Sequence, residues 1–164
     1  QKSNCKFIVI PCNTAHYWYD DLQKKINIPI ISMPKEVYMH ACKTCKKKSK
    51  IGLLATDGTL KTGIYNKFFD KKFVLINPNK ILQTNNVNKA IKFVKMGKIK
   101  EAEKAIKPAV NYLLKMKCKK IILGCTELPI AIFAYKSFKK IKKSKIFIDP
   151  NLLLAQVSMN KYRS

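Results

Sequence analysis

The sequence predicts an α/β protein built on parallel strands. Short apolar runs bounded by turn residues recur along the chain, and a helix-like segment of mixed apolar and polar residues follows each run. Such runs are typical of strands that are buried on both faces of a parallel sheet. Their alternation with helices favours right-handed crossovers between neighbouring parallel strands.

The first part of the chain has the pattern strand, helix, strand, helix. The expected elements, in that order, are 6–10, 14–25, 28–33 and 34–45. Pro34 suits the first turn of the last of these helices. The lysine-rich tract 46–50 comes next, and we interpret it as a solvated linker. We therefore expect residues 1–46 to be the remnant of a first α/β domain.

The same alternation restarts after the linker. Strands are expected at 51–56, 73–76, 120–123 and 145–148, and helices at 60–70, at two segments within 86–117, from about 128 and from about 150. Pro108 lies inside the long helical segment and predicts a kink or a late helix start. Residues 47–164 form the expected second domain, whose last helix could return to pack on the first.

Charge and hydropathy exclude several classes of protein. The chain has 164 residues, of which 47% are hydrophobic, and a net charge of +25. Arg163 is the only arginine among 34 basic residues. Readers of base sequence rely on arginine, so lysine alone predicts only non-specific attraction to nucleic acids. No apolar run approaches the roughly 20 residues that span a bilayer, which argues against a membrane partner.

Six cysteines are present, and they do not suggest a disulfide framework or a metal site. Cys42 and Cys45 form a single CxxC pair, and the chain has only two histidines. A closed zinc site needs four such ligands, so we expect no metal. With no secretory signal in view, free thiols in a reducing cytoplasm are the favoured interpretation.

Two cysteines stand out because they occur in matched contexts. Cys12 and Cys125 each follow a short apolar run and precede a polar residue and a helix. Open α/β sheets bind ligands at the carboxyl ends of their strands. One thiolate could act as a nucleophile with His16, although a packing role for His16 is the alternative. Two thiols across a cleft could instead move protons on opposite faces of one carbon and invert it.

A third motif is the turn Thr56-Asp-Gly-Thr59, which follows the expected strand 51–56. Its hydroxyls and backbone N–H groups at a helix start could bind an anion. The alternative is that Thr59 merely caps the helix.

Taken in order, Pro11-Cys-Asn-Thr-Ala-His16, Thr56-Asp-Gly-Thr59 and Leu123-Gly-Cys-Thr-Glu127 resemble the motifs of the aspartate/glutamate racemase family. The resemblance covers essentially the whole chain. It implies two pseudo-symmetric parallel-sheet domains with an active site between them. It also implies a homodimer that interconverts the L and D forms of aspartate, or of glutamate, without a cofactor. Glu127 favours the aspartate branch, because glutamate racemases tend to have histidine there.

The resemblance also assigns the site. Cys12 and Cys125 are the implied acid/base pair. The implied substrate-binding and pocket-shaping residues are Asn13, Thr14, Thr56, Gly58, Thr59 and Thr126. Family members begin with two further βα units that this sequence lacks, so the first domain is expected to be truncated. The alternative function is a non-catalytic, lysine-rich binding module that retains the racemase fold.

Overall fold

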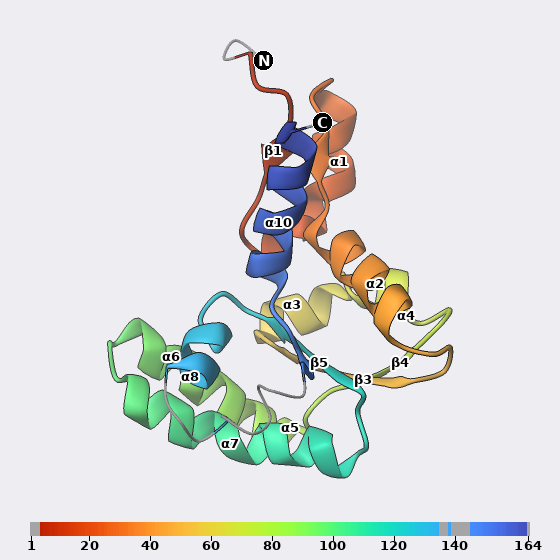
Figure 1. The fold of residues 1–164 in the computed structure, drawn as a ribbon. Helices are drawn as coiled ribbons and strands as arrows, with labels where there is room; N and C mark the ends of the chain where they lie inside the picture. Colours follow the sequence, from red (N-terminus) through yellow and green to blue (C-terminus); the bar gives the residue numbers. More distant parts are fainter. Residues whose placement is uncertain (1–3, 135–137, 139–144, 164) are drawn as a thin grey trace.

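Two all-parallel sheets organise the fold, which confirms the α/β class predicted from the sequence (Figure 1). The computed structural model describes residues 4–134, 138 and 145–163. The smaller sheet pairs β1 (Ile8–Val9) with β2 (Ile30–Ile31). The larger sheet has the order β4-β3-β5-β6. Its strands are β3 (Lys50–Ala55), β4 (Val74–Ile76), β5 (Lys120–Gly124) and β6 (Phe147–Ile148).

Helical segments connect these strands, close to where the sequence places them. In the first part they are the 3₁₀ helix η1 (Thr14–Trp18), α1 (Tyr19–Lys25) and α2 (Met33–Thr44). Between β3 and β5 they are α3 (Asp57–Thr62), α4 (Asn66–Phe69), α5 (Lys80–Leu82), the π-helical η2 (Gln83–Asn88), α6 (Lys89–Lys95) and α7 (Ile99–Lys115). After β5 come α8 (Leu128–Phe133) and α10 (Pro150–Arg163).

The larger sheet is buried on both faces because its central strands are apolar without interruption. In β3, Leu53 packs in the core with α2 and α4, while Leu54 packs in the core with α6, α7 and α8. In β5, Ile122 and Leu123 divide between the same two cores. Successive side chains of a strand point to opposite faces, so a continuous apolar run is needed to fill both layers.

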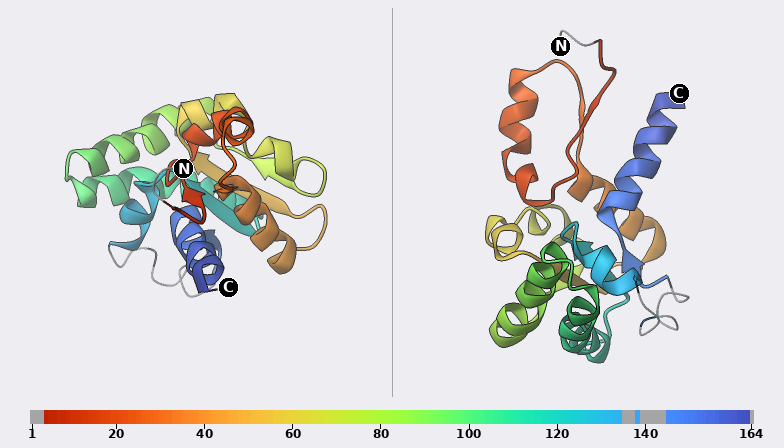
Figure 2. Two further views of the ribbon diagram at one scale, coloured as in Figure 1. Left: turned by 90° about the horizontal axis from the view of Figure 1, so that it is seen from above. Right: turned by 90° about the vertical axis from the view of Figure 1, so that its left-hand side faces the viewer.

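The last helix joins the two parts of the chain. Leu154 of α10 packs with Ile31 and Met33, and α10 also contacts α2. In Figure 1, α10 rises away from the larger sheet, and the right-hand view of Figure 2 shows it on the side of the β1 segment opposite α1. In turn, α2 contributes Val37 and Ala41 to the core of the larger sheet. The final helix therefore packs against residues of the first part of the chain.

Two details of the sequence analysis are wrong. Thr56, and not Thr59, is the N-cap of α3, since its hydroxyl accepts the N–H of Thr59 at 3.2 Å. Of the two alternatives stated for Pro108, a kink or a late helix start, the late start does not occur, because α7 is already helical from Ile99. Proline inside a helix costs about 3 kcal/mol. The apolar face of α7, which includes the fully buried Ile106 and Leu113, offsets this cost.

Candidate active site

A pocket of about 190 Å³ lies where β1, β3 and β5 end. Both highlighted cysteines line it, one from each part of the chain. The lining residues are Cys12, Asn13, Thr14, Thr56, Thr59, Lys95, Gly124, Cys125, Thr126 and Glu127. The carboxyl ends of parallel strands are the expected place for a ligand in such a fold.

His16 fixes the position of the Cys12 backbone. The imidazole is buried, and its Nε2 accepts the N–H of Met33 at 3.1 Å. Nδ1 therefore carries the proton and donates it to the carbonyl of Cys12 at 2.8 Å. Burial lowers the pKa of His16 below its usual value, so the ring stays neutral. Since both ring nitrogens are engaged, the packing interpretation of His16 fits better than a catalytic one.

Three threonine hydroxyls from two elements meet on one side of the pocket. Thr14 and Thr59 share a hydrogen bond of 2.7 Å, and Thr56 lies 3.1 Å from Thr59. Thr56 and Thr14 are 3.4 Å apart, oxygen to oxygen. Each hydroxyl can donate one hydrogen bond and accept others. The cluster can therefore turn its O–H groups toward an anionic ligand.

Asn13 contributes a buried amide to the same pocket. Its Oδ1 accepts the hydroxyl of Tyr65 at 2.6 Å. Its Nδ2 is also buried and has no hydrogen-bond partner among the described residues. A buried N–H without an acceptor is costly, and a bound ligand with an oxygen acceptor relieves that cost.

Glu127 forms a hydrogen bond with the thiol of Cys125 and contributes to the raised pKa of that thiol. The Cys125 thiol donates to Oε2 of Glu127 at 2.9 Å, and Lys95 Nζ lies 3.6 Å from Oε1. Burial, followed by this hydrogen bond, raises the pKa of Cys125 to about 12. Burial alone would raise the pKa of Glu127, but the hydrogen bonds from Cys125 and Thr126 outweigh it and lower that pKa. Glu127 is thus an ionised carboxylate that accepts a hydrogen bond from the protonated thiol of Cys125.

The structure brings together every predicted site residue except Gly58. Gly58 is not among the residues that line the pocket, and a Cβ there would lie 3.4 Å from Cγ2 of Thr14, which does line it. The sequence analysis missed Lys95 entirely and used Glu127 only to favour the aspartate branch, without placing it in the site. Lys95 reaches the pocket from the end of α6, and no motif in the sequence marks it.

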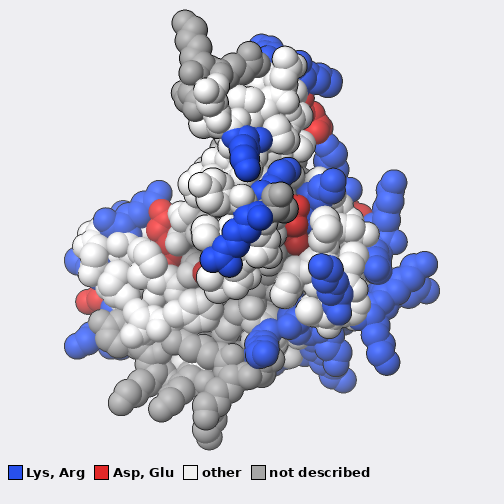
Figure 3. Space-filling view, turned by 45° about the horizontal axis from the view of Figure 1, so that its top comes forward, with Lys and Arg blue, Asp and Glu red and all other residues white. Residues whose placement is uncertain are grey.

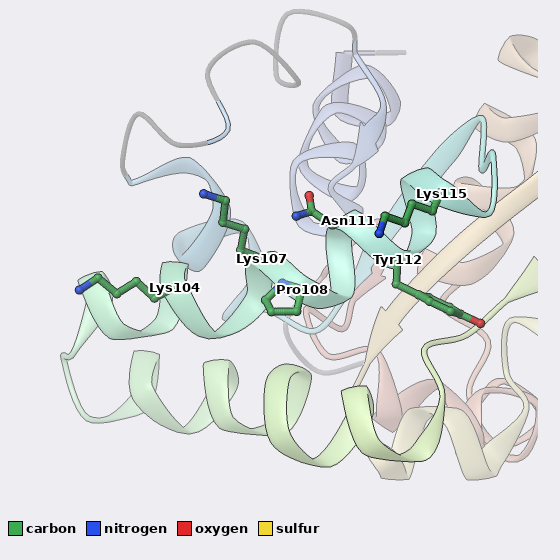
Figure 4. A pocket seen from close by; sticks show the side chains of 6 residues that line it. All are labelled: Lys104, Lys107, Pro108, Asn111, Tyr112 and Lys115. Carbon is green, nitrogen blue, oxygen red and sulfur yellow. The ribbon is translucent and has the colours of Figure 1, made fainter.

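Other surface features do not bring chemistry together in this way. A hollow of about 420 Å³ on α7 is lined by residues of that helix alone, three of them lysines (Figure 4). Lysines are scattered over the face seen in Figure 3. Among the described residues, no group of three His, Cys, Asp or Glu could hold a metal ion. No described helix is both long and apolar enough to cross a membrane. Cys12, Cys42, Cys45, Cys118 and Cys125 are free thiols.

Comparison with known proteins extends these observations. The family model for Asp/Glu/Hydantoin racemases matches residues 1–157. The glutamate racemase of Carboxydothermus hydrogenoformans is 26% identical, and the match covers 99% of this chain and 58% of that enzyme. RacX of Bacillus subtilis, a broad specificity amino-acid racemase, is 23% identical over 99% of this chain and 67% of its own length.

A solved structure agrees with these matches. The aspartate racemase of Picrophilus torridus has a TM-score of 0.75 and 25% identity, covering 98% of this chain and 64% of that one. The chain thus spans less than two thirds of the length of that racemase and of the glutamate racemase. The motifs, the parallel α/β fold and these matches agree, and the chain belongs to the Asp/Glu/Hydantoin racemase family.

Proposed function

We propose that this chain is the catalytic portion of an amino-acid racemase that interconverts L- and D-aspartate, with glutamate as the alternative substrate. The observation that carries the proposal is the presence of Cys12 and Cys125 in one pocket lined by hydrogen-bond donors. Racemisation needs two proton-transfer groups on opposite faces of one carbon. Two thiols from different parts of the chain suit that requirement.

The pocket offers groups for both ends of a dicarboxylic amino acid. Asn13 Nδ2 and the hydroxyls of Thr14 and Thr59 can donate to the α-carboxylate. Lys95 also lines the pocket and provides a positive charge close to Glu127. We propose that Lys95 pairs with the side-chain carboxylate of the substrate. Charged donors bind carboxylates more strongly than neutral ones.

In this mechanism each cysteine serves one enantiomer as base and the other as acid. Cys125 carries a proton directed at Glu127. As an acid, its Sγ–H gives this proton to one face of the α-carbon after the Cys12 thiolate has taken the α-proton from the opposite face. As a base, it first passes the proton to Glu127 and then takes the α-proton of the substrate, while the Cys12 thiol protonates the opposite face. The donors around the α-carboxylate stabilise the negative charge that develops there. No cofactor takes part in these steps.

The test is exchange of the α-hydrogen in D₂O by the complete protein that the gene encodes. We expect aspartate, or failing that glutamate, to racemise and to gain deuterium without pyridoxal phosphate or metal. Cys12→Ser and Cys125→Ser should each abolish racemisation. Cys45→Ser, at a half-buried cysteine outside the pocket, is the matched control and should remain active.

Deuterium incorporation by the two single mutants also shows which face of the α-carbon each cysteine serves. One remaining thiol can still exchange a proton on its own side, so each mutant should incorporate deuterium into one enantiomer only. Racemisation at the wild-type rate by either mutant would contradict the two-thiol mechanism. A complete protein that binds polyanions but neither racemises nor binds these amino acids would favour the non-catalytic alternative.

A further inference from the structure

Tyr65 is buried and forms a hydrogen bond to a residue that the proposed mechanism uses. It lies between α3 and α4, and its side chain is 1% exposed. Its ring packs at an angle on Phe69, with 6.1 Å between centroids. Its hydroxyl donates to Oδ1 of Asn13 at 2.6 Å. Tyr65 is not among the residues that line the pocket, so any effect on a ligand must pass through Asn13.

The hydrogen bond determines which end of the Asn13 amide is available. With Oδ1 engaged by Tyr65, the unpartnered group is Nδ2, a donor. If the amide were turned over, Nδ2 would donate to the Tyr65 oxygen. The phenolic hydrogen would then need another acceptor, and Asn13 is the one partner that the described residues give this hydroxyl. A buried hydroxyl without an acceptor is unfavourable, so the observed orientation is strongly preferred.

The environment of Tyr65 keeps this hydroxyl a donor. Burial, and then the charge of Asp149, raises the pKa of Tyr65 far above its usual value. The phenol therefore stays protonated at neutral pH. A tyrosine that can only donate to Oδ1 leaves Asn13 with only N–H groups to offer.

We infer that Tyr65 is a positioning residue of the substrate site, because its hydroxyl holds the Asn13 amide with an N–H, rather than the carbonyl oxygen, toward the bound carboxylate. The inference rests on the proposed function, since that function places an amino-acid carboxylate in the pocket. It adds a residue outside the pocket on which the affinity for that carboxylate depends. A freely turning amide would present its oxygen part of the time and repel the carboxylate.

The test compares two tyrosines of one aromatic cluster. Tyr65→Phe removes the hydroxyl that reaches Asn13. Tyr38→Phe is the matched control, because Tyr38 also packs on Phe69, with centroids 5.5 Å apart, but lies outside the pocket. Binding of L-aspartate to the complete protein is measured by calorimetry, and KM and kcat are measured alongside. Tyr65→Phe should raise Kd and KM about tenfold, the factor expected for one hydrogen bond, with little change in kcat.

A double-mutant cycle separates positioning from general damage. In an Asn13→Ala background, Tyr65→Phe should cause no further loss of affinity, because there is no amide left to orient. Equal losses in both backgrounds, or a Tyr65→Phe affinity equal to that of Tyr38→Phe, would overturn the inference and leave the proposed function standing. If the wild-type protein bound neither aspartate nor glutamate, the proposed function would fall, and the inference with it.

Discussion

The thiol of Cys125 donates its hydrogen bond to Glu127 over a distance of 2.9 Å. The same carboxylate oxygen accepts the hydroxyl of Thr126 at 2.8 Å. Cys12 has a different environment. It is exposed, and its own carbonyl oxygen accepts a hydrogen bond from His16. The two cysteines occupy the same pocket with unlike surroundings, and the first two experiments below exploit that difference.

We expect Glu127→Gln to lower the pKa of Cys125 below its present value of about 12. The amide keeps a hydrogen-bond acceptor near the thiol but removes the negative charge that disfavours the thiolate. Catalysis should nevertheless fall by about 100-fold or more, since a neutral amide cannot take the thiol proton. The pH dependence of Cys125 alkylation, together with kcat in both directions, checks both statements. An unchanged alkylation profile would show that burial alone sets this pKa.

Alkylation should also distinguish the two cysteines in the wild-type chain. Cys12 is exposed, whereas Cys125 is 8% exposed and protonated at neutral pH. Because the thiolate is the nucleophile, iodoacetamide should modify Cys12 first. Peptide mass mapping resolves the two sites, and the buried Cys118, whose pKa is raised to about 11, serves as an unreactive reference. Faster labelling of Cys125 than of Cys12 would contradict the geometry of the pocket.

Much of the site could be predicted from the sequence because its residues stand in local motifs at strand ends. Cys12, Asn13 and Thr14 follow one strand, and Cys125 and Thr126 follow another. Parallel strands bring such positions to one edge, so no contact needed to be known in advance. The same local logic placed nearly every strand and helix of the described chain.

Residues that reach the site through tertiary packing could not be predicted in this way. Lys95 ends α6 in a chain with many lysines, and nothing local separates it from the others. Tyr65 contacts Asn13 only because α3 and α4 fold back over the first part of the chain. Thr56 caps α3, in place of the Thr59 considered in the sequence analysis, because β3 ends at Ala55 and leaves Thr56 outside the strand. Strand propensity does not determine the residue at which the strand ends.

The stability of the protein should fall below about pH 6.5, and His16 should account for part of the fall. Burial lowers its pKa in the folded state, so the unfolded state binds a proton at higher pH than the folded state does. The stabilising contribution is complete above the unfolded pKa of about 6.5 and is lost as the pH falls toward the folded value. Thermal unfolding between pH 4 and pH 8 measures it.

A matched pair of variants isolates the effect. His16→Gln should flatten the dependence of Tm on pH, although it lowers Tm at pH 8 by removing two hydrogen bonds. His40→Gln is the control, because His40 is less buried and its smaller role should leave most of the acid loss in place. If the Tm of His16→Gln fell with pH as steeply as that of the wild type, the acid sensitivity would belong to other groups.

The smaller sheet should exchange its amide hydrogens faster than the larger one. Within the described residues, β1 and β2 pair only with each other, two residues to each strand. The central strands β3 and β5 pair over five residues and are covered on both faces. Sheet edges leave backbone groups to solvent and open locally at low cost. Hydrogen exchange followed by mass spectrometry on this chain would contradict the expectation if both sheets were equally protected.

Binding to nucleic acids, if measured, should be weak in sequence preference and strong in salt dependence. The chain has 33 lysines and one arginine, and lysines are spread over the face seen in Figure 3. Lysine neutralises phosphates and releases counterions, whereas base edges are read chiefly by arginine and amide side chains. Fluorescence anisotropy with two duplexes of equal length and unlike sequence, from 50 to 200 mM salt, tests this. Similar affinities that fall together by an order of magnitude or more would agree with it. A preference for one duplex that persists at 200 mM salt would contradict the prediction, because it would show that the protein binds a particular base sequence.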